Sequence, residues 1–273
     1  MATSVIYRPA GRAGEYSHRA LNLYEGCGHR CKYCYVARMP QWRDRDFFSF
    51  TPQVRADVIA RLLKDAKQLE GTNERVLMCF SCDPYQPLEE ESNIAGNVIS
   101  ILRQYDIPLQ ILTKGGMRAA KDFDLYGQHD AFATTLTFVN ETKSRECEPF
   151  AATIGDRIKA IKLAKQKGIP TWVSLEPVIN PAWALEIIRQ THPFVDHYKI
   201  GPLNHSPAGV IDWRLFGVKA IELLREYGKS YYIKDDLVKY LDGIHIENTD
   251  TRTVDRPARR PAQQGDLFDK EMP

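Results

Sequence analysis

The chain has 273 residues, of which 43% are hydrophobic and 26% charged, with a formal net charge of +2 and six cysteines. This balance is typical of a globular protein with one full hydrophobic core, and the small net charge does not by itself indicate nucleic-acid binding. The sequence has no apolar run of membrane-spanning length and no apolar signal region at its N-terminus. These features predict a cytoplasmic protein with reduced thiols and no membrane partner.

The first motif follows a short strand predicted over residues 20–24. Cys27, Cys31 and Cys34 have the spacing C-x3-C-x2-C. Zinc sites and iron–sulfur cubes need four ligands, so three thiolates would leave one metal position open for a cofactor or substrate. A zinc site that recruits His29 or His18 remains an alternative, as do disulfides or a chance grouping of buried cysteines. The Gly-, Arg- and Lys-rich composition of the segment favours a loop.

Beyond an aromatic connector with several arginines (residues 37–48), helical and strand-like patterns alternate. Helices are predicted from Thr51-Pro52 to Gly71 and over residues 92–105, 154–167, 181–191 and 213–227, with a short crossover helix before residue 131. Strands are predicted over residues 75–80, 109–113, 131–138, 171–175, 195–200 and 230–233. This order predicts a parallel sheet with right-handed crossovers, either doubly wound or closed towards a barrel.

Unusual polar residues fall at or near the C-terminal ends of these strands. They are the cysteine loop, Asp83, Lys114, Thr135, Thr137, Glu176, Asn204 and His205. The C-terminal ends of parallel strands meet at one face, where the active sites of such folds lie. We therefore expect these residues to converge on one site.

Four motifs resemble the spore photoproduct lyase-like branch of the radical S-adenosylmethionine (SAM) enzymes, often described as DNA repair photolyases. They are the three cysteines, the run from Asp83 to Glu89 (Asp-Pro-Tyr-Gln-Pro-Leu-Glu), Thr113-Lys114, and Glu148-Pro149 followed by Arg157. The resemblance implies an α/β fold, a partial (β/α)6 TIM-like barrel over residues 1–246. It also implies a 4Fe–4S cluster on Cys27, Cys31 and Cys34 whose fourth iron binds SAM. The expected reaction is reductive cleavage of SAM to a 5′-deoxyadenosyl radical, acting on DNA in pyrimidine photoproduct repair or base modification.

The resemblance also assigns roles to individual residues. Tyr33 is expected to contact SAM beside the cluster, Ser81 and Asp83 its amino end, and Lys114 its carboxylate. Thr135 or Thr137 would bind the ribose. Glu176 is a further candidate at the site, and with Asn204, His205 and the arginines of residues 38–45 it would shape the substrate side.

A thiol that returns a hydrogen atom to the substrate radical is also expected from the family. Cys79 and Cys82 are the candidates, although Cys79 also fits a small core residue.

Residues 247–273 lose the apolar periodicity and are expected to form a disordered tail. Gln264, Leu267 and Phe268 belong to a segment that resembles the peptide with which bacterial replication and repair proteins bind the sliding clamp. The expected partners are therefore DNA, the clamp and an electron donor such as flavodoxin or ferredoxin. Two alternatives remain: a radical SAM enzyme that acts on RNA, a peptide or a small molecule, and a non-catalytic iron–sulfur adaptor recruited to the clamp.

Overall fold

The computed structural model describes residues 4–203 and 211–256, and this part of the chain contains a seven-stranded sheet in which all strands are parallel. Its order follows the chain: β1 (Arg19–Leu21), β4 (Val76–Met78), β5 (Leu109–Thr113), β6 (Ala131–Thr135), β7 (Thr171–Val178), β8 (His197–Pro202) and β9 (Ser230–Ile233). The predicted open parallel barrel is confirmed, with β9 as a seventh parallel strand.

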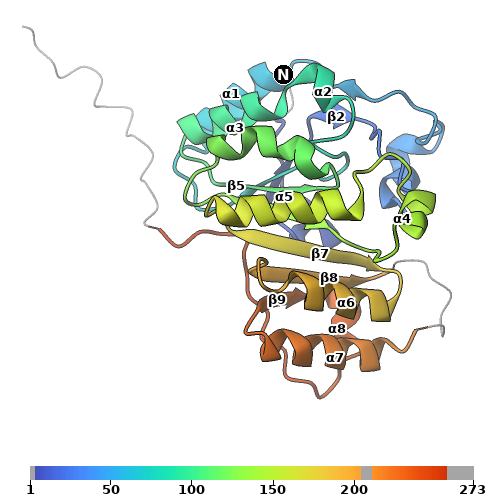
Figure 1. Ribbon diagram of the computed structural model, residues 1–273. Helices are drawn as coiled ribbons and strands as arrows, with labels where there is room; N and C mark the ends of the chain where they lie inside the picture. The colour runs from blue at the N-terminus through green and yellow to red at the C-terminus, as the bar shows by residue number, and fades with distance from the viewer. Residues whose placement is uncertain (1–3, 204–210, 257–273) are drawn as a thin grey trace, which may run out of the picture.

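The helices between the strands cover one face of the sheet, which Figure 1 shows for α3, α5, α6 and α7. Their bounds are α1 (Val58–Gln68), α2 (Glu89–Ser92), α3 (Ala95–Gln104), α4 (Glu141–Cys147), α5 (Ile154–Gln166), α6 (Pro181–Thr191), α7 (Trp213–Glu226) and α8 (Asp235–Val238). The 3-10 helix η4 (Gly116–Leu125) makes the predicted short crossover before β6. Within the described ranges, no helix is long and apolar enough to cross a membrane.

Local sequence signals explain where several helices begin. The side chain of Asn180 accepts hydrogen bonds from the backbone of Ala182 and Trp183 at the start of α6, where Pro181 occupies the first turn. Thr153 caps α5 and Asp212 caps α7 in the same way. Such caps satisfy backbone N–H groups that have no partner inside a helix. The predicted bounds of α5, α6 and α7 therefore agree with the structure to within one residue.

Three of the predicted elements differ most from the structure. The helix predicted from Thr51-Pro52 begins at Val58, and Gln53–Val54 form a strand instead. The helix predicted over residues 92–105 begins at Ala95 as α3, and the short α2 before it ends at Asn93, which has a left-handed φ of 45°. The Glu89 carboxylate accepts hydrogen bonds from the backbone of Ile94 and Ala95, so it caps α3 from within α2. The strand predicted over residues 20–24 ends at Leu21, and β2 (Tyr24–Glu25) pairs instead with β3 (Gln53–Val54) in a separate antiparallel ribbon.

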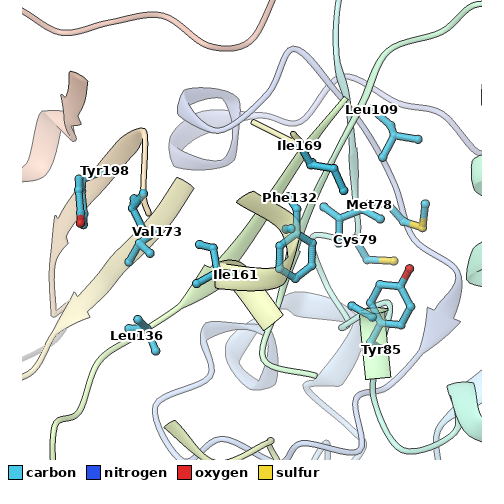
Figure 2. Close-up of a cluster of buried hydrophobic side chains, with 14 of the residues drawn as sticks. Met78, Cys79, Tyr85, Leu109, Phe132, Leu136, Ile161, Ile169, Val173 and Tyr198 are labelled. Atoms are coloured by element: carbon cyan, nitrogen blue, oxygen red, sulfur yellow. The ribbon is translucent and has the colours of Figure 1, made fainter. Parts of the chain in front are cut away.

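The main hydrophobic core lies between the sheet and its helices. Figure 2 shows part of it, with Met78, Phe132 and Val173 from the strands and Ile161 from α5. The opposite face of the sheet, here called the inner face, carries the alternate residues of each strand. The inner face holds a second, smaller apolar cluster formed by Tyr16, Ala20, Leu77, Ala131, Ala133 and Trp172.

Both ends of the described chain pack on this body. The N-terminal arm contains the 3-10 helix η1 (Gly11–Glu15) and brings Tyr16 onto the inner face. At the other end, Val254 is buried and its backbone N–H bonds to Asn73, while Arg256 pairs with Asp106. The ordered body therefore extends at least to Arg256, past the predicted boundary at residue 246.

Candidate active site

The cysteine loop, residues 26–34, leaves the β2–β3 ribbon and leads into the 3-10 helix η2 (Tyr35–Arg38). Gly26 begins the loop with a φ of 79°, and a Cβ at this position would lie 2.7 Å from the ring of Phe50. A side chain is therefore excluded there by both conformation and space. The loop packs on a small apolar cluster formed by Val36, Trp42 and Phe47.

All three thiols of the loop are free, with Cys31 buried and Cys27 and Cys34 partly buried. Burial, with Asp83 and Cys31 nearby, raises the pKa of Cys27 well above its ordinary value. Burial also raises the pKa of Cys31 to about 12. Thiolates in such a place need a positive centre, and a bound metal ion or cluster provides one. The free thiols leave no disulfide in the motif.

The histidine in the loop does not complete a zinc site. His29 is buried, with Nδ1 3.3 Å from the Asp83 carboxylate and Nε2 3.1 Å from Nη2 of Arg118. Because Arg118 can only donate, Nε2 accepts and Nδ1–H donates to Asp83, so both ring nitrogens are engaged. Within the described ranges, no three His, Cys, Asp or Glu side chains lie close enough to hold a single metal ion. A four-iron cluster spaces its ligands more widely, and three thiols without a fourth protein ligand fit it.

Asp83 joins the cysteine loop to the end of β5. Its carboxylate accepts hydrogen bonds from Thr113 Oγ1 at 2.5 Å and from the backbone N–H of Lys114 at 2.7 Å, besides the contact with His29. Although burial acts in the opposite direction, His29, Thr113 and Lys114 hold the pKa of Asp83 well below its usual value. The predicted contact of Asp83 with SAM stays a prediction, and these partners occupy much of its carboxylate.

Lys114 and Tyr33 lie against one another, with Nζ of Lys114 5.6 Å from the centre of the Tyr33 ring. The hydroxyl of Tyr33 donates to the buried carboxylate of Glu148. Glu148 in turn forms an ion pair of 2.6 Å with Arg157, and both side chains are almost fully buried. The predicted contacts of Tyr33 and Lys114 with SAM stay predictions, and the structure brings the two side chains together beside the thiols.

The two threonines differ in what their hydroxyl groups do. Thr137 lies beyond the end of β6 and donates to Glu148 at 3.2 Å. Thr135 is the last residue of β6 and lies opposite Ser174 of β7 on the inner face. Its carbonyl accepts a hydrogen bond from Arg157 at 3.2 Å. Of the two threonines, Thr135 is therefore the better candidate for a ribose contact.

Glu176 belongs to a second polar cluster near the C-terminal end of β7. Its carboxylate forms an ion pair of 2.9 Å with Lys234 and accepts a hydrogen bond from the hydroxyl of Tyr16. Ser174 contacts the same hydroxyl at 2.9 Å. The side chain of Glu176 is partly exposed, so this cluster borders the site from the β7 side.

Neither candidate hydrogen donor is held on the inner face. Cys79 is buried in the core between the sheet and the helices, next to Met78 and Tyr85 in Figure 2. Its Sγ accepts a hydrogen bond from the backbone of Leu23 at 3.5 Å. Cys82 is partly exposed and packs at the edge of the same core. The position of Cys79 supports its alternative reading as a core residue.

Several site residues could not be found from the sequence. The Asn22 side chain accepts hydrogen bonds of 2.8 Å from the backbone of both Phe80 and Ser81, and it thereby fixes the loop after β4. Lys199 is buried on the inner face, where Nζ lies 5.0 Å from the Trp172 ring and donates to the carbonyl of Tyr16. No motif spacing marks these residues, because the contacts depend on strands that are distant in sequence. Asn204, His205 and the segment with Gln264, Leu267 and Phe268 lie outside the described residues.

Comparison with known sequences shows what this chain resembles. The profile of the Radical SAM superfamily matches residues 21–191. An uncharacterized protein of Methanocaldococcus jannaschii is 28% identical over 187 residues, which cover 67% of this chain and 70% of that protein. An uncharacterized protein of Mycobacterium tuberculosis is 26% identical over 167 residues, and the match covers 58% of this chain and 49% of that protein. The chain thus spans about half the length of this mycobacterial relative.

Solved structures resemble the fold. A mutant of spore photoproduct lyase with bound AdoMet and dinucleoside spore photoproduct superposes with a TM-score of 0.62, covering 80% of this chain and 76% of that one at 11% identity. SuiB of Streptococcus suis bound to S-adenosylmethionine gives a TM-score of 0.60, covering 84% of this chain and 53% of that one at 12% identity. At these identities the likeness is one of fold.

Proposed function

Because the chain belongs to the radical SAM superfamily, and therefore uses a 4Fe–4S cluster and SAM, we propose that it is an enzyme that acts on a nucleobase in DNA. The reaction is either reversal of a pyrimidine photoproduct or modification of a base. The fold likeness to a lyase that holds a dinucleoside photoproduct supports this choice. RNA, peptides and small molecules are the competing substrates, and a non-catalytic adaptor is the competing role.

The observation that carries the proposal is a line of aromatic rings beside the cysteine loop. Tyr35 is 46% exposed, directly follows Cys34, and lies edge-on to Phe80 with ring centres 6.1 Å apart. Phe80 contacts Tyr16 on the inner face at 5.9 Å in the same way. Exposed aromatic rings with nearby cationic groups are typical of surfaces that stack nucleobases and follow a phosphate backbone. Arg38, the last residue of η2, and Arg43, five residues further along the chain, are exposed and would supply such groups.

Cys27, Cys31 and Cys34 would hold the cluster through three irons. When bound together, the cluster and SAM supply reductive cleavage of the SAM sulfonium. Tyr33 and Lys114 would orient SAM, Lys114 by attracting its carboxylate, and Thr135 would bond the ribose. Glu176, held by Tyr16 and Lys234, would border the substrate. An electron donor such as flavodoxin or ferredoxin would serve the cluster.

The deciding experiment is a SAM-cleavage assay on anaerobically reconstituted protein with dithionite as reductant. We expect about four irons per chain and formation of 5′-deoxyadenosine that depends on all three loop cysteines. UV-irradiated and untreated DNA are then compared with RNA and peptides as substrates. Conversion of a DNA base or lesion supports the proposal, whereas conversion of RNA or peptide alone contradicts it. A protein that binds iron but never cleaves SAM would favour the adaptor.

A binding experiment tests the aromatic line separately. Tyr35→Leu should weaken the affinity for single-stranded DNA by about 5-fold to 150-fold, because stacking of one base contributes about 1–3 kcal/mol. Tyr240→Leu removes a tyrosine of similar exposure near α8 and should leave the affinity unchanged. Fluorescence anisotropy at two salt concentrations measures both variants. Equal affinities for the two variants would contradict the placement of DNA beside Tyr35.

A further inference from the structure

Gln86 lies between the Asp83–Glu89 run and the cysteine loop, and its side chain is 0% exposed. Its Oε1 accepts a hydrogen bond of 2.5 Å from the backbone N–H of Gly28. The neighbouring Pro87 packs so closely that a Cβ on Gly28 would lie 3.2 Å from the proline ring. Gln86 is therefore held firmly against the loop, next to the residue that follows Cys27.

The other half of the same amide has no protein partner. Nε2 of Gln86 is buried and lacks a hydrogen-bond acceptor among the described residues. Turning the amide over would bring its NH2 group against the N–H of Gly28, so that two donors faced each other. The observed orientation is thus fixed by Gly28. A buried amide N–H left without a partner costs about 1–3 kcal/mol, and native proteins seldom leave one so.

A bound cluster would offer the acceptor that the protein does not supply. Gln86 contacts the residue that follows Cys27, one of the three cysteines placed on the cluster, and the thiolate and sulfide sulfurs of such clusters accept N–H hydrogen bonds. We propose that Nε2 of Gln86 donates a hydrogen bond to a sulfur of the bound cluster, either Cys27 Sγ or an inorganic sulfide. Gln86 is then a positioning residue that acts through the cluster and does not touch the substrate.

This hydrogen bond has a defined effect on the electron transfer. Reduction adds negative charge to the cluster, and an N–H group directed at its sulfur stabilises the more negative state. Gln86 therefore raises the reduction potential and makes the cluster easier to reduce. The inference rests on the cluster and not on the proposed DNA substrate, so an assay that finds a different substrate leaves it intact.

Pulsed electron paramagnetic resonance of the reduced cluster tests the contact directly. The protein is prepared with 15N in the glutamine side-chain amides, and a weak 15N coupling to the cluster is expected in the wild type. The coupling should disappear in Gln86→Glu, which keeps an oxygen for Gly28 but has no amide nitrogen. It should persist in Gln104→Glu, which changes an exposed glutamine at the end of α3. A wild-type protein without the coupling, or a coupling that survives in Gln86→Glu, would overturn the proposal.

Redox titration tests the consequence. Gln86→Met has a side chain of similar length and no N–H group, and its midpoint potential should shift to more negative values than that of the wild type or of Gln104→Glu. Iron content is measured in each sample. If Gln86→Met does not retain the cluster, the 15N coupling in the wild type and in Gln86→Glu decides whether Gln86 bonds to the cluster. An unchanged potential in a fully loaded Gln86→Met protein would overturn the redox role.

Discussion

Glu148 connects three parts of the site through a single carboxylate. It accepts hydrogen bonds from Tyr33 of the cysteine loop and from Thr137 after β6, and it pairs with Arg157 of α5. Burial alone would raise the pKa of Glu148, but Arg157 and Lys114 hold this pKa below its usual value. Glu148 is therefore charged at neutral pH, and Arg157 depends on it for a buried counter-ion.

Replacing Glu148 by Gln should lower the free energy of unfolding by about 3–5 kcal/mol, because Arg157 would stay buried without its partner charge. The double variant Glu148→Gln/Arg157→Met should be more stable than the single variant, since no lone charge remains. Anaerobic urea denaturation of the cluster-free protein measures both. A single variant within about 1 kcal/mol of the wild type would show that the pair is not the main support of the site.

Lys199 is the second residue with an unusual environment. Its ammonium lies among the rings of Tyr16, Trp172 and Tyr232, at 5.0–5.8 Å from their centres. Burial, together with the nearby Arg252, Lys234 and Arg75, lowers the pKa of Lys199 to about 7, although Asp250 acts in the opposite direction. Inside the fold, this lysine therefore loses its proton far more easily than an ordinary lysine.

The titration of Lys199 gives a prediction with a definite sign. Between about pH 7 and the usual lysine pKa of 10.5 the unfolded chain holds a proton that the folded protein has lost, so stability should rise with pH across this range. Spectra of 13Cε-labelled lysine should contain one resonance that titrates near pH 7 and is absent in Lys199→Met. The prediction fails if every lysine resonance titrates above about pH 9.

At the scale of elements, the site depends on close approach between loops that follow neighbouring strands. Gly115 follows β5, and a Cβ there would lie 2.4 Å from Cβ of Tyr85 and 2.6 Å from its carbonyl oxygen. A side chain would push the turn that starts at Asp83 away from the end of β5. Gly155 lies in α5, where a Cβ would meet nothing within 4 Å.

The two glycines form a matched pair for mutation. Gly115→Ala should lower the free energy of unfolding by about 1–3 kcal/mol and weaken SAM binding, because overpacking shifts Lys114 and Asp83. Gly155→Ala, in the first turn of α5, should leave the free energy of unfolding unchanged or raise it by up to about 0.5 kcal/mol, since glycine loses more backbone freedom on folding than alanine does. Thermal denaturation and SAM titration compare them. Equal stability of the two variants would mean that the turn can move without cost.

Helices and strands with local sequence signals could be predicted, whereas contacts between distant segments could not. Apolar runs and helix caps are local, so β5, β7, α5, α6 and α7 were predictable, and so was the position of Asp83 and Lys114 at strand ends. The contacts that complete the site are not local. Tyr16 bonds to Ser174, which lies 158 residues further along the chain, and the path of the N-terminal arm over the inner face has no pattern of its own. For the same reason, the contacts of Asn22 and Lys199 could not be predicted from the sequence.

At the scale of the whole molecule, residues 249–256 pack along the N-terminal ends of the strands. Thr249 bonds to Tyr231 of β9, and Glu74, just before β4, pairs with Thr253. Arg256 then bonds to Asp106, before β5, at 2.6 Å. Residues 249–256 therefore cross from the β9 edge to the β4 side along the N-terminal ends of the strands.

Deleting residues 247–273 should lower the free energy of unfolding by about 3 kcal/mol, because buried Val254 and the hydrogen bonds of Arg256 are lost. Deleting residues 262–273 should leave stability and SAM cleavage unchanged. Urea denaturation and the SAM-cleavage assay compare the two truncations side by side. If the longer deletion is as stable as the shorter one, the crossing segment contributes nothing to the body.

This crossing also decides where the remainder of the chain is attached. Arg256 is fixed beside Thr72, Asn73 and Asp106, at the N-terminal ends of the strands, whereas Lys114 and the cysteine loop lie at the C-terminal ends. Figure 1 shows the chain near residue 250 on the side away from α4. The described chain therefore ends on the side of the sheet opposite the C-terminal strand ends, near which Asp83 and Lys114 lie.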